Sequence, residues 1–227
     1  ASMTRLQQAA AFLQSGDTAR ALAIAEAEAK SNPQDAEALH LMALALSKTG
    51  DVDRAATAFE AAAALHPRKE IILVNLGNHL KRAGRLREAA EAYERAAAAA
   101  PGSAGAWAAL GAARAQLSDN PAAAEAYNRA LGLNANNAAA LIGLGNLAAA
   151  RGRHADAIGS FTQAIAADPR SYAAHVNRGA ALRMLGRTGE ALADLDRALT
   201  LAPGHPEAAF QRASTLRVIG RFDEAAV

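Results

Sequence analysis

The 227-residue chain contains no cysteine, which excludes disulfides, thiolate nucleophiles and zinc sites built on cysteine. Aromatic residues make up only 4% of the sequence, and four lysines leave most of the positive charge to arginine. No run of about 18 apolar residues is free of charges or breaks, so we expect no transmembrane helix. Glutamines near the start occupy the place where a signal peptide needs an apolar core. These absences favour a cytoplasmic location.

The charge of the chain is nearly balanced, with a formal net charge of +2. Bulk electrostatics therefore give no reason to expect nucleic acid as a partner, and we expect no membrane partner either. Alanine, leucine and arginine are the commonest residues of the sequence. All three are strong helix formers, so composition alone favours an all-α protein.

Proline is scarce, and most of the prolines and some of the glycines recur in a common phase at intervals of 34 residues or twice that. The phased prolines are Pro33, Pro67, Pro101, Pro169 and Pro203. The phased glycines are Gly16, Gly50, Gly84, Gly152, Gly186 and Gly220. Ala135 and Ser118 occupy the two missing positions. A fixed period of this length indicates a repeat architecture.

The period predicts a single array over residues 2–227, with six complete copies and one partial copy. The copies run near 2–35, 36–69, 70–103, 104–137, 138–171, 172–205 and, in part, 206–227. Within a copy, apolar residues recur at helical spacing before and after the glycine, which predicts two helices joined by a tight turn. In the fourth copy, Asn120 is predicted to cap the second helix and Pro121 to lie in its first turn. Ala1 and Ser2, before Met3, are expected to be a cloning remnant.

The fourth copy carries Trp107, Leu110 and Gly111 on its first helix and Ala123, Tyr127 and Ala130 on its second. With this phasing the chain resembles the tetratricopeptide repeat (TPR) family over essentially its whole length. The resemblance implies an all-α, right-handed α-solenoid in which first helices line a concave groove. It also implies a non-catalytic scaffold that binds an extended peptide or partner segment there, without a cofactor. The aromatic residues Phe59, Tyr93, Tyr127 and Phe161 are expected to fill the gap to the neighbouring copy.

Polar residues on the first helices are candidates for peptide contact. In the third copy Asn75, Asn78, His79 and Arg82 are predicted to share one face, opposite the apolar residues of the same helix. A primary amide can satisfy a peptide N–H and C=O together. The third copy resembles repeats of the O-linked N-acetylglucosamine transferases, in which asparagines grip the substrate backbone. The alternative interpretation is that these side chains are solvated or form hydrogen bonds between helices.

The full candidate set combines asparagines and cations at groove positions of several copies. It comprises Asn75, Asn78, Lys81, Arg82, Asn146, Asn177, Arg183, Gln211 and Arg217. Lys48 lies near the first group of cations, and small residues separate that group from the last. We therefore predict a peptide with bulky side chains in its middle and acidic residues near its ends. No copy has lysine at its fifth position, which argues against the carboxylate clamp of chaperone-binding repeats.

Two arginines stand where the repeat pattern expects a buried leucine. Arg178 and Arg212 would be costly at these positions without a carboxylate partner. Asp194 and Asp196 lie on the following helix pattern and are the predicted partners. We interpret these residues as structural ion pairs.

Catalytic motifs are not supported by the sequence. The segment GLGNLA, residues 143–148, imitates a dinucleotide loop but lies inside a predicted helix without a preceding strand, so its glycines are predicted to serve helix contact. The histidines are scattered, which argues against a metal site. We expect this chain to have no enzyme activity of its own.

The sequence leaves three functions open. The first is a scaffold for protein–protein interaction. The second is the substrate-recognition arm of a larger enzyme, such as a glycosyltransferase, sulfotransferase or oxygenase, with its catalytic domain beyond Val227. The third is a scaffold that self-associates through an open end, because an uncapped solenoid exposes apolar surface.

Overall fold

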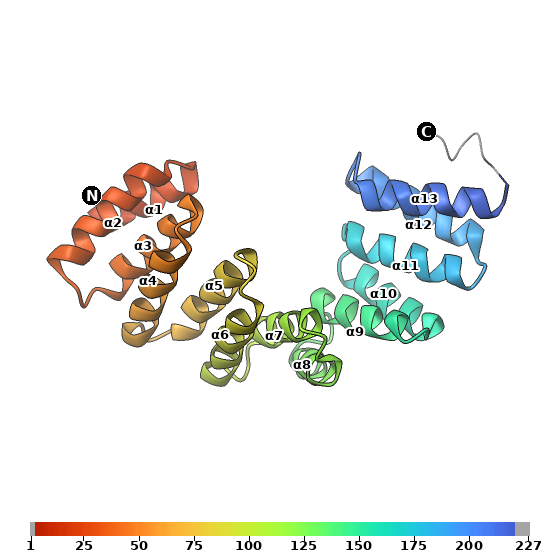
Figure 1. Ribbon diagram of the computed structural model, residues 1–227, viewed down its shortest axis with the longest axis horizontal. Helices are drawn as coiled ribbons and strands as arrows, with labels where there is room; N and C mark the ends of the chain where they lie inside the picture. Colours follow the sequence, from red (N-terminus) through yellow and green to blue (C-terminus); the bar gives the residue numbers. More distant parts are fainter. Residues whose placement is uncertain (1–2, 221–227) are drawn as a thin grey trace. The chain divides into compact units, whose positions relative to one another are not determined.

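The computed structural model describes residues 3–220, and within this range the chain forms thirteen helices and no strand (Figure 1). The predicted second helix of the seventh copy falls at residues 221–227, and the expected cloning remnant at residues 1–2; both lie outside the described residues. The helices are α1 (Arg5–Ser15), α2 (Thr18–Ser31), α3 (Ala36–Thr49), α4 (Val52–Leu65), α5 (Lys69–Arg82), α6 (Leu86–Ala99), α7 (Ala104–Gln116), α8 (Asn120–Leu133), α9 (Ala138–Ala150), α10 (His154–Ala167), α11 (Tyr172–Met184), α12 (Thr188–Leu201) and α13 (Pro206–Val218).

The helices belong to two compact units, unit 1 up to Leu117 and unit 2 from Ser118 onward. Within each unit, every helix packs against the next one, and each first helix of a repeat also contacts the first helix of the next repeat. The contacting first helices are α1, α3, α5 and α7 in unit 1, and α9, α11 and α13 in unit 2. Each unit therefore presents one continuous surface made of first helices, which we call its first-helix face. Stacking of this kind buries the apolar stripe that a lone helix pair would expose.

The phased glycines mark the turns inside the helix pairs. Gly50 and Gly84 have φ values of 85° and 78°, the left-handed conformation that glycine adopts at little steric cost. Ser118 replaces glycine in the fourth copy and adopts the same region, with φ of 62°. The turn geometry, rather than packing, therefore explains why glycine recurs with the repeat.

The predicted cap of the fourth copy is off by one residue. Asp119, not Asn120, is the N-cap of α8, and its carboxylate accepts a hydrogen bond from the Ala122 backbone N–H at 3.3 Å. Asn120 is the first helical residue, and Pro121 lies in the first turn as predicted. A charged oxygen at the cap also interacts favourably with the helix dipole, which explains why the aspartate takes this place.

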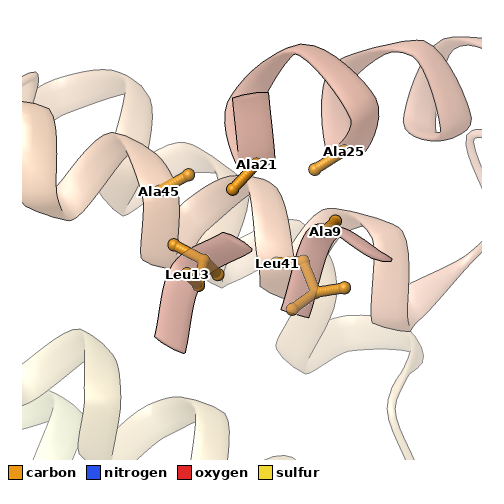
Figure 2. Close-up of a cluster of buried hydrophobic side chains, with 6 residues drawn as sticks. All are labelled: Ala9, Leu13, Ala21, Ala25, Leu41 and Ala45. Atoms are coloured by element: carbon orange, nitrogen blue, oxygen red, sulfur yellow. The ribbon is translucent and has the colours of Figure 1, made fainter. Parts of the chain in front are cut away.

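The core is built mainly from alanine and leucine. Figure 2 shows one cluster in unit 1, to which α1, α2 and α3 each contribute two side chains. Its members are Ala9, Leu13, Ala21, Ala25, Leu41 and Ala45. Small side chains at these positions let three helices approach closely.

Aromatic rings fill the spaces that alanine leaves. Phe59, Tyr93, Tyr127 and Phe161 are at most 4% exposed. Phe161 packs against Gly145 so closely that an added Cβ would lie 2.5 Å from the ring, and Tyr127 leaves no room for a Cβ at Gly143. Both glycines of the GLGNLA segment therefore serve helix contact, as predicted.

The predicted ion pairs are present in unit 2. Arg178 Nε and Nη2 lie 2.6 and 2.7 Å from the two carboxylate oxygens of Asp194. Arg212 Nε lies 2.6 Å from Asp196 Oδ1. Asp194 is 6% exposed and also meets His175 Nδ1 at 3.0 Å. Its hydrogen bond to Arg178 raises the pKa of that guanidinium, so this cluster is a paired structural element.

Within residues 3–220, none of the helices has the length and hydrophobicity needed to cross a membrane.

Candidate functional site

The predicted asparagines of unit 1 bond to neighbouring side chains. Asn75 Nδ2 lies 3.1 Å from His40 Nε2 on α3. Burial lowers the pKa of His40, which favours the neutral ring whose nitrogen can accept this bond. Asn78 Oδ1 accepts a hydrogen bond of 2.7 Å from the Tyr93 hydroxyl, and burial raises the pKa of that phenol to about 12.

His79 does not lie on the exposed face where the sequence placed it. Its side chain is only 3% exposed, with Nδ1 2.8 Å from Ser47 Oγ and Nε2 2.9 Å from the Val52 carbonyl oxygen. A histidine can be buried here because both of its ring nitrogens have partners. Arg82 Nη2 donates to the same Ser47 oxygen at 2.7 Å. We call His40, Ser47, Asn75, His79 and Arg82 the unit 1 polar cluster.

The lysines near this cluster differ in their contacts. Lys48 Nζ donates to the Leu13 carbonyl at 2.9 Å, so it closes the last turn of α1. Lys81 is half-buried and makes no hydrogen bond or ion pair within residues 3–220. Apart from Lys81, each of the predicted site residues of unit 1 bonds to another residue of the same unit.

In unit 2 the two predicted asparagines bond to each other. Asn177 Nδ2 on α11 donates to Asn146 Oδ1 on α9 at 2.9 Å. This bond uses one donor of Asn177 and one acceptor position of Asn146. The Asn146 NH₂ group and the Asn177 carbonyl oxygen keep their capacity to donate and to accept. Asn146 is exposed and Asn177 half-buried, so a partner chain can reach the pair.

One hollow includes this asparagine pair in its lining, and a second hollow shares Arg183 with it. The first has a volume of about 160 Å³, and its lining includes Asn146, His154, Asn177, Arg183 and Met184. The second has a volume of about 400 Å³ and is lined by Arg183, Ser214, Arg217 and Val218. We call the two together the double pocket. It lies on the first-helix face of unit 2, because α9, α11 and α13 supply nearly all of its lining.

The hydrogen-bond donors of the Arg183 guanidinium are only partly used. Its Nη2 lies 3.4 Å from Gln211 Oε1, while Gln211 Nε2 donates to Glu207 at 2.9 Å. Arg183 Nε is buried and has no partner. An unmade hydrogen bond to a buried donor costs about 1–3 kcal/mol. Arg217 is exposed, and within residues 3–220 no carboxylate lies within ion-pair distance of either guanidinium.

Sequence reasoning missed His154, Met184 and Ser214. His154 Nδ1 is buried without a partner, and Met184 is 57% exposed. A helical signal for Met184 was available: it follows Asn177 by seven residues, which places both on one face of α11. His154 begins α10, and the first-helix pattern gave no reason to examine it.

A larger hollow lies elsewhere in unit 1 and contains none of the predicted residues. It has a volume of about 640 Å³ and includes Glu60, His66, Lys69 and Arg95 in its lining. Glu60 and Arg95 pair with each other through two hydrogen bonds of 2.7 and 2.8 Å. Because its main charges neutralise each other, we assign it no ligand.

Among the described residues, no group of three histidine, aspartate or glutamate side chains is arranged to hold a metal ion.

The model of the tetratricopeptide repeat family matches the chain at residues 6–70, 40–104, 74–138, 142–206 and 185–226. No curated protein matches the sequence. Proteins of this family generally mediate protein–protein interaction.

Several solved structures share the fold. A tetratricopeptide repeat protein from Parabacteroides merdae ATCC 43184 aligns with a TM-score of 0.78 and 20% identity, over 98% of this chain and 88% of that one. MamA aligns with a TM-score of 0.61 and 27% identity, over 70% of this chain and 94% of that one. YrrB, described as a TPR protein with an unusual peptide-binding site, aligns with a TM-score of 0.59 and 24% identity, over 81% and 95%.

Proposed function

This chain belongs to the tetratricopeptide repeat family, and from that premise we propose that it binds an extended segment of a partner protein across the first-helix face of unit 2. The observation that carries the proposal is the double pocket, whose two hollows meet at Arg183 beside the Asn146–Asn177 pair. YrrB, which is described as having a peptide-binding site, supports only the general kind of function proposed here. The positions proposed here come from this chain alone.

The asparagine pair suits the backbone of an extended segment. An extended peptide presents N–H and C=O groups on each side, and each group needs a partner when it is desolvated. The Asn146 NH₂ group would donate to a peptide carbonyl, and the Asn177 oxygen would accept from a peptide N–H. Hydrogen bonds to the backbone of the bound peptide give affinity without selecting its side chains. Sequence specificity would then come from other contacts on the same face.

The smaller hollow suits one side chain of the bound segment. Its volume of about 160 Å³ is below the range of about 300–1,000 Å³ typical of sites for small organic ligands. Met184 supplies an exposed, flexible apolar wall, and such side chains adapt to ligands of different shape. A single apolar side chain is therefore the occupant that we assign to it.

Unit 1 is a weaker place for the same contact. Asn75, Asn78 and Arg82 already bond to His40, Tyr93 and Ser47. Binding a peptide through them would exchange existing bonds for new ones, with little net gain. For this reason we place the main contact on unit 2.

The test compares binding of a pool of random, N-acetylated and C-amidated peptides to the wild-type chain and to the Asn146→Ala/Asn177→Ala variant. Each lost bond is expected to cost about 1 kcal/mol, so the double variant should bind on the order of 30-fold more weakly. Asn128→Ala is the matched control, because Asn128 is exposed on α8 of the same unit and lies outside the double pocket. Equal binding by the double variant and the wild type would refute the asparagine contact.

A further inference from the structure

We propose that the double pocket recognises a carboxylate of the bound segment and holds it between Arg183 and Arg217. This inference rests on the proposed function and names the chemistry that would give the face its sequence preference. Arg183 lies on α11 and Arg217 on α13, and both line the same hollow beside Ser214. Two guanidinium groups and a hydroxyl around one space form a donor-rich site for an anionic oxygen pair.

A comparison of the half-buried arginines of unit 2 indicates that Arg183 lacks a carboxylate partner. Three arginines of this unit are half-buried in the described range, and two of them, Arg178 and Arg212, have aspartate partners at 2.6 Å. Arg183 is the third, and it has no carboxylate partner there. An arginine removed from water normally requires an opposite charge. Arg183 therefore has the surroundings of an ion-paired arginine, and the bound partner would supply the anion.

The existing partner of Arg183 is easily displaced. Gln211 meets it at 3.4 Å, at the limit of a hydrogen bond, and that amide is also engaged by Glu207 at 2.9 Å. A carboxylate in the hollow would form shorter, charge-assisted bonds and draw the guanidinium away from its present position. Arg183 Nε would thereby have the opportunity to gain the partner it lacks.

The position differs from that of the carboxylate clamp that the sequence excludes. That clamp needs a lysine at the fifth position of a repeat, whereas Arg183 and Arg217 occupy equivalent later positions on neighbouring first helices. The smaller hollow with Met184 adjoins Arg183. The segment that fits both hollows thus has an apolar side chain next to a carboxylate.

The experiment is a competition on the full chain between peptide pools that differ at one fixed central position, glutamate in one pool and glutamine in the other. Both pools are random elsewhere, N-acetylated and C-amidated, and the bound fraction of each is counted by mass spectrometry. A third pool carries the central glutamine and a free C-terminal carboxylate. We expect about tenfold enrichment of at least one carboxylate pool over the amidated glutamine pool at low salt. The pool that is enriched identifies the source as a side chain or a chain end.

Matched variants test whether the two arginines cause the preference. Arg183→Gln/Arg217→Gln is expected to abolish the enrichment, whereas Arg170→Gln/Arg197→Gln, with the same change in charge at exposed positions of unit 2, should retain it. Arg217→Gln alone alters an exposed side chain and should reduce the enrichment even if the double variant fails to fold. Equal retention of all pools by the wild type would overturn the carboxylate site while leaving peptide binding intact. Loss of enrichment in the control variant would overturn it as well, whereas failure of every pool to bind would reject the proposed function itself.

Discussion

On the first-helix face of unit 1, Asn75 bonds to His40 and Arg82 bonds to Ser47. On that of unit 2, Asn146 and Asn177 bond to each other and Arg183 keeps a buried Nε without a partner. Similar residue types therefore have different roles in the two units. In unit 1 they join neighbouring repeats through hydrogen bonds, and in unit 2 they surround hollows and retain unused donors and acceptors.

The comparison teaches that polarity on a helix face does not by itself identify a binding surface. What distinguishes the first-helix face of unit 2 is that hollows, incompletely satisfied polar groups and an uncompensated charge lie together at Arg183. Polar groups that are already satisfied contribute to stability instead. Variants of the two units should therefore separate stability from binding.

The largest expected effect is on the stability of unit 2 and follows from Asp194→Ala. This change leaves Arg178 and His175 partly or fully buried without their carboxylate. Removal of one partner from such a cluster is expected to lower the free energy of unfolding by about 3 kcal/mol. Hydrogen exchange followed by mass spectrometry should show faster exchange in α11 and α12, while α3 to α5 keep their protection. Equally faster exchange in α3 to α5 would contradict a loss of stability confined to the surroundings of Asp194.

A smaller effect is expected for His79→Ala in unit 1. The change removes the partner of the Val52 carbonyl and one partner of Ser47, and it leaves a cavity where a buried ring stood. We expect a loss of about 2 kcal/mol from the free energy of unfolding, measured by chemical denaturation. Peptide binding should be unchanged at a temperature where the variant is folded. A parallel loss of binding would place the contact on unit 1 and reverse the comparison.

The smallest expected effect is the contribution of His40, in unit 1, to the pH dependence of stability. The pKa of His40 is lowered from its ordinary value of 6.5, mainly by burial. The folded state therefore binds a proton less readily than the unfolded state, and stability is full above the ordinary value and falls as the pH drops through the lowered one. The thermal midpoint should decrease between about pH 7 and pH 5, and His40→Gln should make this decrease shallower. An unchanged slope in His40→Gln would show that other groups cause the dependence.

The repeat period made most of the fold predictable from the sequence. Glycine at most of the tight turns and proline after most of the second helices set the phase, and α3, α7, α9, α11 and α13 begin at intervals of 34 residues or twice that. The Arg178–Asp194 pair was predictable for a different reason, because a charge at a core position requires a partner. These inferences needed only local rules and a period.

The contacts of the site could not be obtained in the same way. His79 was placed on the exposed face because its helix position is polar, but Ser47 and Val52 of the preceding repeat accommodate it inside. The bond between Asn146 and Asn177 joins residues 31 positions apart, and its existence depends on how two repeats stack. Whether an amide on the helix surface is already hydrogen-bonded depends on the side chains of the neighbouring repeat. The repeat period does not predict those contacts.

The alanine-rich core has a consequence for how the sequence can change. Ala21, Ala25 and Ala45 have almost nothing to lose by truncation, so stability is distributed over many small contacts. Substitution by larger residues is expected to destabilise the core, because a side chain at Gly145 would collide with Phe161. The tolerance of this protein to mutation is therefore asymmetric: the core admits little growth, whereas exposed side chains without hydrogen-bond partners can change at little cost.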